Sequence, residues 1–348
     1  MNEWIWLDMD GTIYEGGRLF RCVNEFLSHI EETGGKYIFI TNNSSRSVKD
    51  YVIKLSNMGV KVTEDNFFTS SQATALYLND RYKNKKIYCM GTRSMIAEME
   101  KYGVNIVTEP DEDTDCIVVG YDTELTYKKF WDVSYLLQTK KDIPYIATNP
   151  DRGCPTEFGL VPDCFAMCEA INYAAKRRPL YIGKPDGFMI DYCVERSPFT
   201  KEQTVVIGDR LYTDIASGVN AGVDTICVLS GESRLADIEK SEIKPTYVYK
   251  DIKDDFEVRK TINSVIYTCQ QSIGCTLDAL NNSNKAKKKN GNYFEILIRN
   301  TVKTCGINID DKDEIVNLAD TDETMKFEHD IILLNSKKYQ KEAFYCRE

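Results

Sequence analysis

The sequence predicts an α/β fold with a doubly wound parallel sheet, a second α/β unit inserted into it, and a C-terminal extension of different character. Short apolar runs alternate with helical patterns, and glycine closes the first two of these patterns. This βαβα rhythm is typical of a parallel sheet covered by helices on both faces. The rhythm restarts near Lys85 and near Pro179, and it stops after Val258.

The first predicted unit, residues 1–82, alternates strands and helices in order. Its apolar runs WIWL and KYIFI are short and bounded by polar residues, which is typical of buried strands. The segments CVNEFLSHIEETGG and SVKDYVIKLSNMGV have helical spacing, and NFFTSSQATALYLNDRY reads as a strand that enters a helix.

The second predicted unit, residues 83–179, repeats this alternation. KKIYCMG, CIVVGYD and PYIATNP predict strands, while MIAEMEKYG and KKFWDVSYLLQ predict helices. The aromatic residues Phe130, Trp131 and Tyr135 fall on a helical period, so we expect them in the core of this unit rather than as a platform for substrate.

The third predicted unit, residues 180–258, contains PLYIGKPDG, a helix that ends near CVERS, and the strands TVVIGD and DTICVLSG. These last strands are apolar on both faces, as expected of buried parallel strands. If they join the sheet begun by WIWL, the second unit is an insertion and four strand ends meet at one edge. Residues 259–348 carry a predicted helix, a Lys-rich linker and a short ordered piece. The chain stops at FYCRE with no evident terminating element, which suggests a part of something longer.

Composition excludes several classes of function. A formal net charge of -10 disfavours nucleic acid as a partner, because phosphate backbones are bound by clustered Lys and Arg. With only two histidines and no GxSxG, a Ser-His-Asp or Cys-His mechanism is disfavoured, and the absence of GxGxxG after the first strand argues against a nucleotide-dependent oxidoreductase. No apolar run approaches the ~20 residues that cross a bilayer. The twelve cysteines show no CxxC, so we expect reduced thiols in a cytoplasmic protein.

Polar residues follow four of the predicted strands directly, in WIWL-DMDGT, YIFI-TNNSS, YI-GKPDG and VVI-GDRLYTD. Ligands of open α/β sheets bind outside the carboxyl ends of the strands, so we expect these residues in one site. Asp8, Asp10 and Asp209 are hard oxygen donors that suit Mg²⁺. Thr41 and the backbone N–H groups of Asn42 and Asn43 could hold phosphate oxygens at the positive end of a helix.

Lys184 would supply the remaining positive charge of this site. One carboxylate can then attack phosphorus while its neighbour acts as a general acid and later as a base. Gly11 would let the backbone turn so that the second aspartate lies beside the first. Each motif alone has an ordinary interpretation; Asp209 or Asp214, for example, could simply cap a helix. Four motifs in order are hard to obtain by chance.

DMDGT, TNN, GKPD and GDRLYTD, in this order, resemble the four motifs of the haloacid dehalogenase superfamily. The insertion resembles the α/β cap of its class II members, the branch of p-nitrophenyl phosphatase-like, phosphoglycolate-type and nucleotide-type phosphatases. ATNPD and DTICVLSGES are also similar to that branch, and the resemblance spans roughly residues 1–258. It implies a Rossmann-like core with an inserted cap, and copies that associate through that cap.

The resemblance also implies roles for individual residues. Asp8 would be the nucleophile that becomes an aspartyl-phosphate, Asp10 the acid and base, and Lys184 a group that steadies both Asp8 and the phosphoryl group. Mg²⁺ would be held by the Asp8 side chain, the Asp10 backbone carbonyl and Asp209, with Asp214 in support. Thr41 and Asn42 would bind the phosphoryl group. The second aspartate favours a phosphatase over a dehalogenase.

We therefore expect a Mg²⁺-dependent phosphatase that acts on a small phosphorylated metabolite, such as a sugar phosphate, a nucleotide, phosphoglycolate or p-nitrophenyl phosphate. The alternative is a binding or regulatory protein in which residues 259–348 carry the main role and phosphatase activity is weak. Asn149 and Asp151, in the insertion, are expected to face substrate, although both are equally plausible as turn residues around Pro150. The sequence does not identify the ester.

Overall fold

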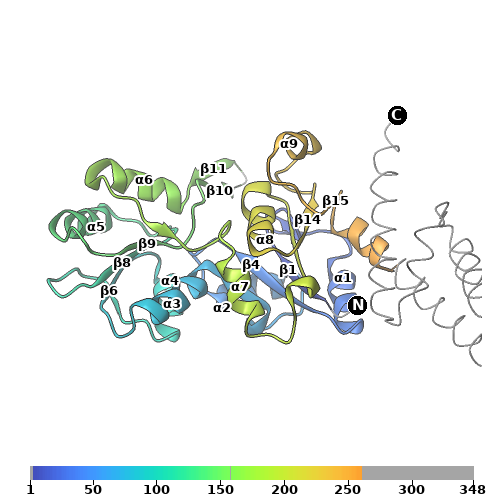
Figure 1. The fold of residues 1–348 in the computed structure, drawn as a ribbon, viewed down its shortest axis with the longest axis horizontal. Helices are drawn as coiled ribbons and strands as arrows, with labels where there is room; N and C mark the ends of the chain where they lie inside the picture. Colours follow the sequence, from blue (N-terminus) through green and yellow to red (C-terminus); the bar gives the residue numbers. More distant parts are fainter. Residues whose placement is uncertain (1–2, 157, 261–348) are drawn as a thin grey trace, which may run out of the picture. The chain divides into compact units, whose positions relative to one another are not determined.

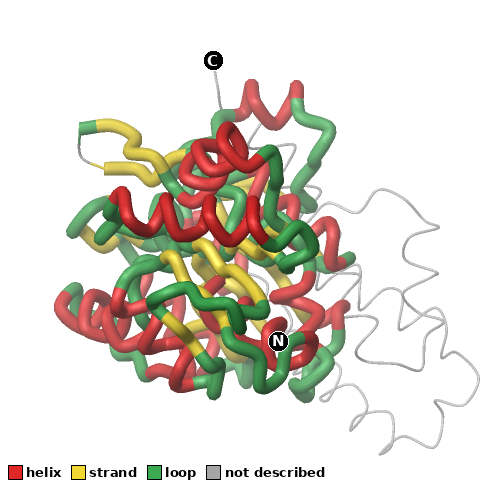
Figure 2. The backbone as a smooth tube through the Cα atoms, turned by 90° about the vertical axis from the view of Figure 1, so that its left-hand side faces the viewer, coloured by secondary structure: helices red, strands yellow, loops and turns green. Residues whose placement is uncertain are grey.

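The computed structural model describes residues 3–156 and 158–260. The chain divides into two compact units, and all the helices and strands named below lie in the first of them, which ends at Ile252. Figure 1 shows the elements along the chain, and Figure 2 shows the strands in yellow between helices in red. Apart from Arg259 and Lys260, the predicted extension of residues 259–348 lies outside the described residues.

The first sheet has six strands in the order β15-β14-β13-β1-β4-β5, and all its neighbours pair in parallel. Its strands are β1 (Trp4–Leu7), β4 (Lys36–Thr41), β5 (Phe67–Thr69), β13 (Thr204–Gly208), β14 (Asp224–Val228) and β15 (Tyr247–Tyr249). The chain runs outward from β1 on one side through β4 and β5, and on the other through β13, β14 and β15. This reversal at β1 is the arrangement of a doubly wound fold, as predicted, and it creates a crevice at the carboxyl end of β1.

The second sheet has five parallel strands in the order β12-β9-β8-β6-β7. These are β6 (Ile87–Met90), β7 (Ile106–Val107), β8 (Cys116–Val119), β9 (Tyr145–Ala147) and β12 (Leu180–Tyr181). The sheet is inserted between β5 and β13 of the first sheet, which confirms a core with an inserted α/β cap.

The strand before GKPD departs from the sequence-based expectation. β12 pairs with β9 in the second sheet, so the prediction that all four strand ends lie along one sheet was wrong. The physical reason is that the chain enters the first sheet only at β13, after the intervening helix α7 (Phe188–Val194). Lys184 therefore reaches the site from a loop that leaves the second sheet.

Helices cover both faces of the second sheet (Figure 1). On one face, α3 (Ser70–Arg81) and α4 (Arg93–Lys101) pack with residues such as Cys89 and Val118. On the other, α5 (Tyr127–Thr139) and α6 (Cys164–Ala175) pack with Tyr88 and Ile117. Because successive strand residues point to opposite faces, both sets of strand residues are buried.

The remaining helices belong to the first sheet and its connections. They are α1 (Val23–Glu32), α2 (Val48–Asn57), α7, α8 (Ala216–Ala221) and α9 (Leu235–Lys240), with short turns η1 (Glu64–Asn66) and η2 (Lys201–Gln203) and a π-helical turn η3 (Leu211–Ile215). The predicted helices are thus present where the apolar spacing indicated them. The turn η3 is wider than an α-helix and begins two residues after Asp209.

Two short hairpins were not predicted. They join β2 (Tyr14–Glu15) to β3 (Arg18–Leu19) and β10 (Gly153–Thr156) to β11 (Gly159–Pro162), both antiparallel. Their strands are rich in Gly, Pro and polar residues and are largely exposed, so they lack the alternation that marks a half-buried strand.

Trp131 and Tyr135 of α5 are not in the core, contrary to expectation, whereas Phe130 is half-buried and packs against the core of this unit. Trp131 is 66% exposed and Tyr135 is 50% exposed, while α5 buries Val133, Leu136 and Leu137 instead. The helical period places Trp131 and Tyr135 on one face, but a period alone does not fix which face turns inward. With Tyr127 and residues of α6 they line a surface groove of about 650 Å³.

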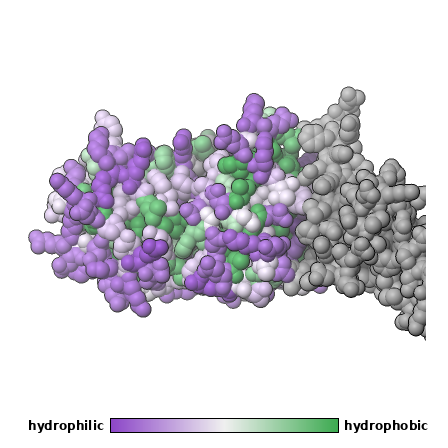
Figure 3. Space-filling view, in the orientation of Figure 1, coloured by the Kyte–Doolittle hydropathy of each residue, from purple (hydrophilic) through white to green (hydrophobic). Residues whose placement is uncertain are grey.

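The surface seen in the orientation of Figure 1 is mostly hydrophilic over the described residues, with smaller hydrophobic areas between (Figure 3). Among the described residues, no helix has the length and apolar character needed to cross a membrane.

Candidate active site

A cavity of about 820 Å³ opens at the carboxyl ends of β1, β4 and β13. Its walls come from the first sheet, the β2–β3 hairpin, the loop into α2, and the segment from Asp151 to the β10 strand. The lining residues that can donate, accept or carry charge include Asp8, Asp10, Tyr14, Thr41, Asn42, Asn43, Arg46, Tyr51, Lys54, Asp151, Cys154, Asp163, Lys184, Arg210 and Asp214. This is the crevice that the doubly wound topology predicts.

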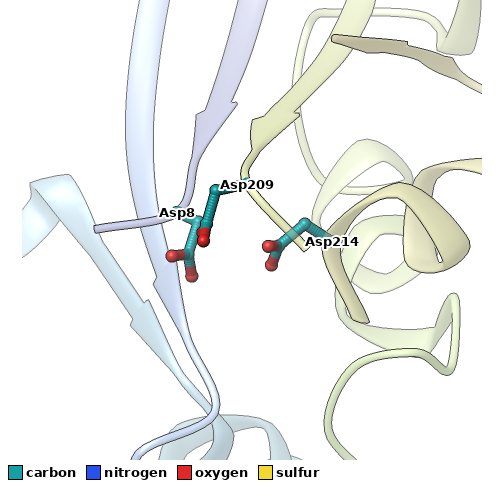
Figure 4. Close-up of side chains that lie close together, drawn as sticks. All are labelled: Asp8, Asp209 and Asp214. Atoms are coloured by element: carbon teal, nitrogen blue, oxygen red, sulfur yellow. The ribbon is translucent and has the colours of Figure 1, made fainter. Parts of the chain in front are cut away.

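Three carboxylates converge at one end of this cavity. Asp8 follows β1, Asp209 follows β13 and Asp214 lies in η3, and one oxygen of each lies within 4.8 Å of the others. Figure 4 shows the three side chains turned toward a common space. Carboxylate oxygens at such distances could hold a divalent cation, and Mg²⁺ prefers these ligands.

The electrostatics of this cluster favour a bound cation. Burial raises the pKa of Asp8 to about 8, the charge of Asp214 adds to the rise, and the Lys184 ammonium opposes it. Burial and the charge of Asp214 likewise raise the pKa of Asp209 to about 7. Positive charge at the cluster stabilises the ionised forms, which resolves the mutual repulsion of these carboxylates.

Glycines leave room for Asp209. A Cβ atom on Gly11 would lie 2.6 Å from Oδ2 of Asp209, and one on Gly231 would lie closer still. Gly11 also has φ +82°, a left-handed conformation that suits glycine. The Glu232 N–H donates to Asp209 at 2.7 Å, and the Ser230 hydroxyl donates to the Gly11 carbonyl at 2.7 Å, so the loop after β14 fixes this carboxylate.

Lys184 is the central cation of the site. Its ammonium donates to Asp8 at 2.6 Å and to Asp214 at 2.5 Å, and the residue is only 3% exposed. Burial favours the neutral amine, but the charges of Asp214 and Asp8 outweigh this effect, so the pKa of Lys184 lies above its usual value. The group is therefore charged and fixed beside Asp8.

Asn42 holds the Lys184 loop in place. Its side-chain oxygen accepts from the Lys184 backbone N–H at 2.8 Å, and its amide donates to the Lys184 carbonyl at 2.9 Å and to Asp151 at 3.0 Å. The side chain of Asn42 thus has a structural role, although the residue lines the cavity beside Thr41 and Asn43.

The prediction that a helix N-terminus lies directly at Asn42 and Asn43 was wrong. The helix α2 begins at Val48, and its first N–H groups are occupied by the Ser47 side chain and by Glu98. The Asn43 N–H donates to the Thr41 hydroxyl at 3.1 Å. The segment TNNSS forms a loop stabilised by its own side chains, which the sequence does not distinguish from the first turn of a helix.

Asp10 lies in the same cavity but apart from the carboxylate cluster. It is bridged to Tyr14 at the start of the β2–β3 hairpin, and among the described residues the group of clustered carboxylates comprises Asp8, Asp209 and Asp214. The Asp10 carboxylate is therefore not part of this cluster, and the expected role of the Asp10 backbone carbonyl in holding Mg²⁺ stays a prediction. Burial raises the pKa of Asp10, while Lys54 and Arg210 oppose the rise.

Asp151 and Asn149, the two cap residues expected to face substrate, differ in their position relative to the cavity. Asp151 lines the cavity, and burial raises its pKa. Asn149 does not line it: its side chain is fully buried, donates to the Asn42 carbonyl at 2.7 Å and accepts from the Asp151 N–H at 3.0 Å. The expectation that Asn149 faces substrate was therefore wrong, because both polar atoms of its side-chain amide form hydrogen bonds with the backbone.

Several lining residues were missed from the sequence. Arg210 lies inside the GDRLYTD motif and forms an ion pair with Glu232 at 2.9 Å. Arg46 and Lys54 follow the TNN motif, and their approach to the cavity depends on where α2 begins. Asp163, at the N-terminus of α6, shows no signal in the sequence other than its position before a helix.

The fold and the site define a class: an α/β protein with a parallel-sheet core and an inserted cap, whose cavity brings together a buried lysine and carboxylates that could hold a divalent cation. Two family models match the chain, haloacid dehalogenase-like hydrolase over residues 5–105 and HAD-hydrolase-like over residues 181–255.

Known proteins of similar sequence and structure agree with these matches. An acid sugar phosphatase of Staphylococcus epidermidis is 31% identical over 246 residues, which cover 71% of this chain and 93% of the relative. The 4-nitrophenylphosphatase of Thermotoga maritima superposes with a TM-score of 0.70 and 39% identity, covering 74% of this chain and 97% of that one. A glycerol phosphate phosphatase of Mycobacterium tuberculosis, solved in complex with magnesium, has a TM-score of 0.68, 26% identity and coverage of 73% and 76%.

The chain belongs to the haloacid dehalogenase-like hydrolases. It is an enzyme of the phosphatase class within that family, as the four motifs predicted.

Proposed function

We propose that this enzyme hydrolyses small phosphomonoesters with the help of Mg²⁺ and through an aspartyl-phosphate on Asp8. The observation that carries the proposal is the position of Asp8, at a strand end in the cavity, paired with Lys184 and next to Asp209 and Asp214. A carboxylate so placed can reach a phosphoryl group while neighbouring positive charge stabilises it.

In the proposed reaction, an oxygen of Asp8 attacks phosphorus as the bond from phosphorus to the ester oxygen breaks. Asp10 gives its proton to the leaving oxygen, and it later takes a proton from the water that attacks the aspartyl-phosphate. The second attack releases inorganic phosphate and restores the Asp8 carboxylate. The raised pKa of Asp10 supports its role as the acid, because a protonated carboxyl group is needed first.

Three carboxylates, Asp8, Asp209 and Asp214, would hold Mg²⁺ in this enzyme. The bound ion would neutralise charge on the phosphoryl oxygens. Lys184 would keep the attacking oxygen of Asp8 oriented and add a positive charge to the same region, while Thr41 and Asn43 line the cavity where the phosphoryl group would lie. We further propose that the second sheet and its helices act as the cap that selects the leaving group. Association through the cap and a cytoplasmic location stay predictions.

The test is the variant Asp8→Asn, assayed with p-nitrophenyl phosphate. It should abolish turnover, because an amide is a poor nucleophile, while circular dichroism should be unchanged. Removing divalent cations with EDTA should also stop turnover, and added Mg²⁺ should restore it. Full activity of Asp8→Asn would contradict the proposed nucleophile.

A further inference from the structure

Four cations line the active-site cavity, and two of them are neutralised by carboxylates. Lys184 pairs with Asp8 and Asp214, and Arg210 pairs with Glu232. The other two are Arg46 and Lys54. Within residues 3–156 and 158–260, neither forms an ion pair with a carboxylate, although Asp10 and Glu15 line the cavity from the β2–β3 hairpin and the Asp10 charge acts on Lys54.

The backbone fixes the position of Arg46 although its side chain is exposed. The preceding residue, Ser45, donates its N–H and its hydroxyl to Asn43, and the following residue, Ser47, caps α2 through Asp50. Arg46 is therefore presented at the cavity from a segment that is hydrogen-bonded on both sides. An arginine so placed has a planar group suited to a carboxylate or a phosphate.

Lys54 is held against an aromatic ring. Its ammonium lies 3.9 Å from the centre of the Tyr14 ring, and Tyr14 is buried in the hairpin after Asp10. Burial lowers the pKa of Lys54, the Asp10 carboxylate opposes this, and the guanidinium of Arg46 lowers it further. Both cations line the same cavity and the charge of Arg46 disfavours that of Lys54, so an anion bound beside them would relieve that repulsion.

The charges on the other walls of the cavity oppose an anion there. Asp151 and Asp163 line the cap side. At a pH where these two carboxyl groups are ionised, a negatively charged group on the substrate would avoid them and bind near Arg46 and Lys54. Arg46 and Lys54 therefore supply positive charge to the cavity at positions distinct from that of Lys184.

From this arrangement we infer that Arg46 and Lys54 form a subsite for a second anionic group of the substrate, a carboxylate or a second phosphate. The inference rests on the proposed function, because it presupposes that the first phosphate lies beside Asp8 and Lys184. The preferred substrates are then phosphomonoesters that carry another negative charge on the leaving group.

The experiment compares matched substrates that differ in the second anion. One pair is 3-phosphoglycerate and glycerol 3-phosphate, which differ in a carboxylate, and the other is fructose 1,6-bisphosphate and fructose 6-phosphate, which differ in a phosphate. The ratio of kcat/KM within each pair is measured for the natural protein, Arg46→Gln and Lys54→Met. Lys54→Met keeps an unbranched side chain against Tyr14 but removes the charge. The pair of substrates whose ratio changes identifies the second anion as a carboxylate or a phosphate.

The natural protein should favour the doubly anionic member of at least one pair, and each variant should lower that ratio by roughly tenfold, mainly through KM. The control is Lys49→Met, which removes an exposed positive charge from the same helix outside the cavity and should leave the ratio unchanged. A ratio near one in the natural protein overturns the inference alone. An equal loss of kcat/KM for both members of a pair also overturns it, since the two cations would then bind the phosphate that is transferred. No turnover of any of the four substrates would contradict the proposed function as well.

Discussion

Asp163 is a buried acid that is not placed in the proposed chemistry. It caps α6 by accepting from the Cys164 N–H at 2.5 Å, and it faces the cavity. Burial raises its pKa to about 7, a rise that the hydrogen bond from Cys164 only partly opposes. The folded state therefore keeps the proton on this carboxyl group at a pH where the unfolded chain has lost it.

This shift predicts a specific dependence of stability on pH. Because the pKa is higher in the folded state, the contribution of Asp163 to the free energy of unfolding falls as pH rises from about 4 to about 7, and it is level above that. Asp163→Asn keeps a good capping residue and removes the ionisation. Its stability relative to the natural protein should therefore increase over this range, by on the order of a few kcal/mol in total.

Urea unfolding at pH 4.5, 6 and 8 measures this difference. The exposed Asp142 provides a control, since Asp142→Asn should change the free energy of unfolding by less than about 0.5 kcal/mol at each pH. If the difference for Asp163→Asn is the same at all three values, the pKa of Asp163 is not raised in the folded protein.

For single residues, the sequence correctly predicted those site residues that follow a strand closely. Asp8, Asp209 and Lys184 were found in this way, because the carboxyl end of a strand or the loop after it is fixed by the topology. Arg46 and Lys54 could not be identified in this way. Their positions depend on the length of the loop before α2, and side-chain hydrogen bonds determine that length. Asn149 was misassigned because a turn residue and a ligand-binding residue have the same amino-acid preferences.

Among the elements, the end of β4 and the Lys184 loop form one hydrogen-bonded unit through Asn42. Three of its bonds reach residues more than 100 positions away in the chain, at Asp151 and Lys184. Since Asn42 is 4% exposed, water does not readily replace it as a partner.

Asn42→Ala should therefore lower the free energy of unfolding by about 1–3 kcal/mol, because it leaves buried backbone groups of Lys184 without partners. It should also lower kcat for p-nitrophenyl phosphate by at least about tenfold, since Lys184 no longer has a fixed position beside Asp8. A suitable control is Asn24→Ala, which removes one exposed hydrogen bond to the Gly59 carbonyl. Equal effects of the two variants would show that Asn42 does not position Lys184.

Strands and helices were predictable where burial imposes a pattern. The central strands β1, β13 and β14 are largely buried and mostly apolar, because helices cover both faces of their sheet. The hairpin strands β2, β3, β10 and β11 escaped prediction, since they are short and mostly exposed. β12 was assigned to the wrong sheet, because a strand of only two residues does not indicate which strand it pairs with.

For the first unit as a whole, one hydrophobic cluster contains residues of both sheets. Trp6 and Val206 come from the first sheet, Cys89 and Val118 from the second, and Leu78 from the helix α3. Sequence periodicity identified each of these segments as apolar but could not show that they share a core. The relatives match a segment of comparable length. The alignments take in 71–74% of this chain and 93–97% of the acid sugar phosphatase and the 4-nitrophenylphosphatase.

The shared cluster predicts that the two sheets unfold together. Leu78 is 1% exposed, so Leu78→Ala should leave a cavity that costs about 2–5 kcal/mol. If the core is continuous, this loss should reduce protection in both sheets equally. Hydrogen exchange in increasing urea, followed by mass spectrometry of peptides from β13 and from β8, measures each sheet separately. Ile53→Ala, at an exposed position of α2, should leave both nearly unchanged. Loss of protection in only one sheet would mean that the cap unfolds independently of the core.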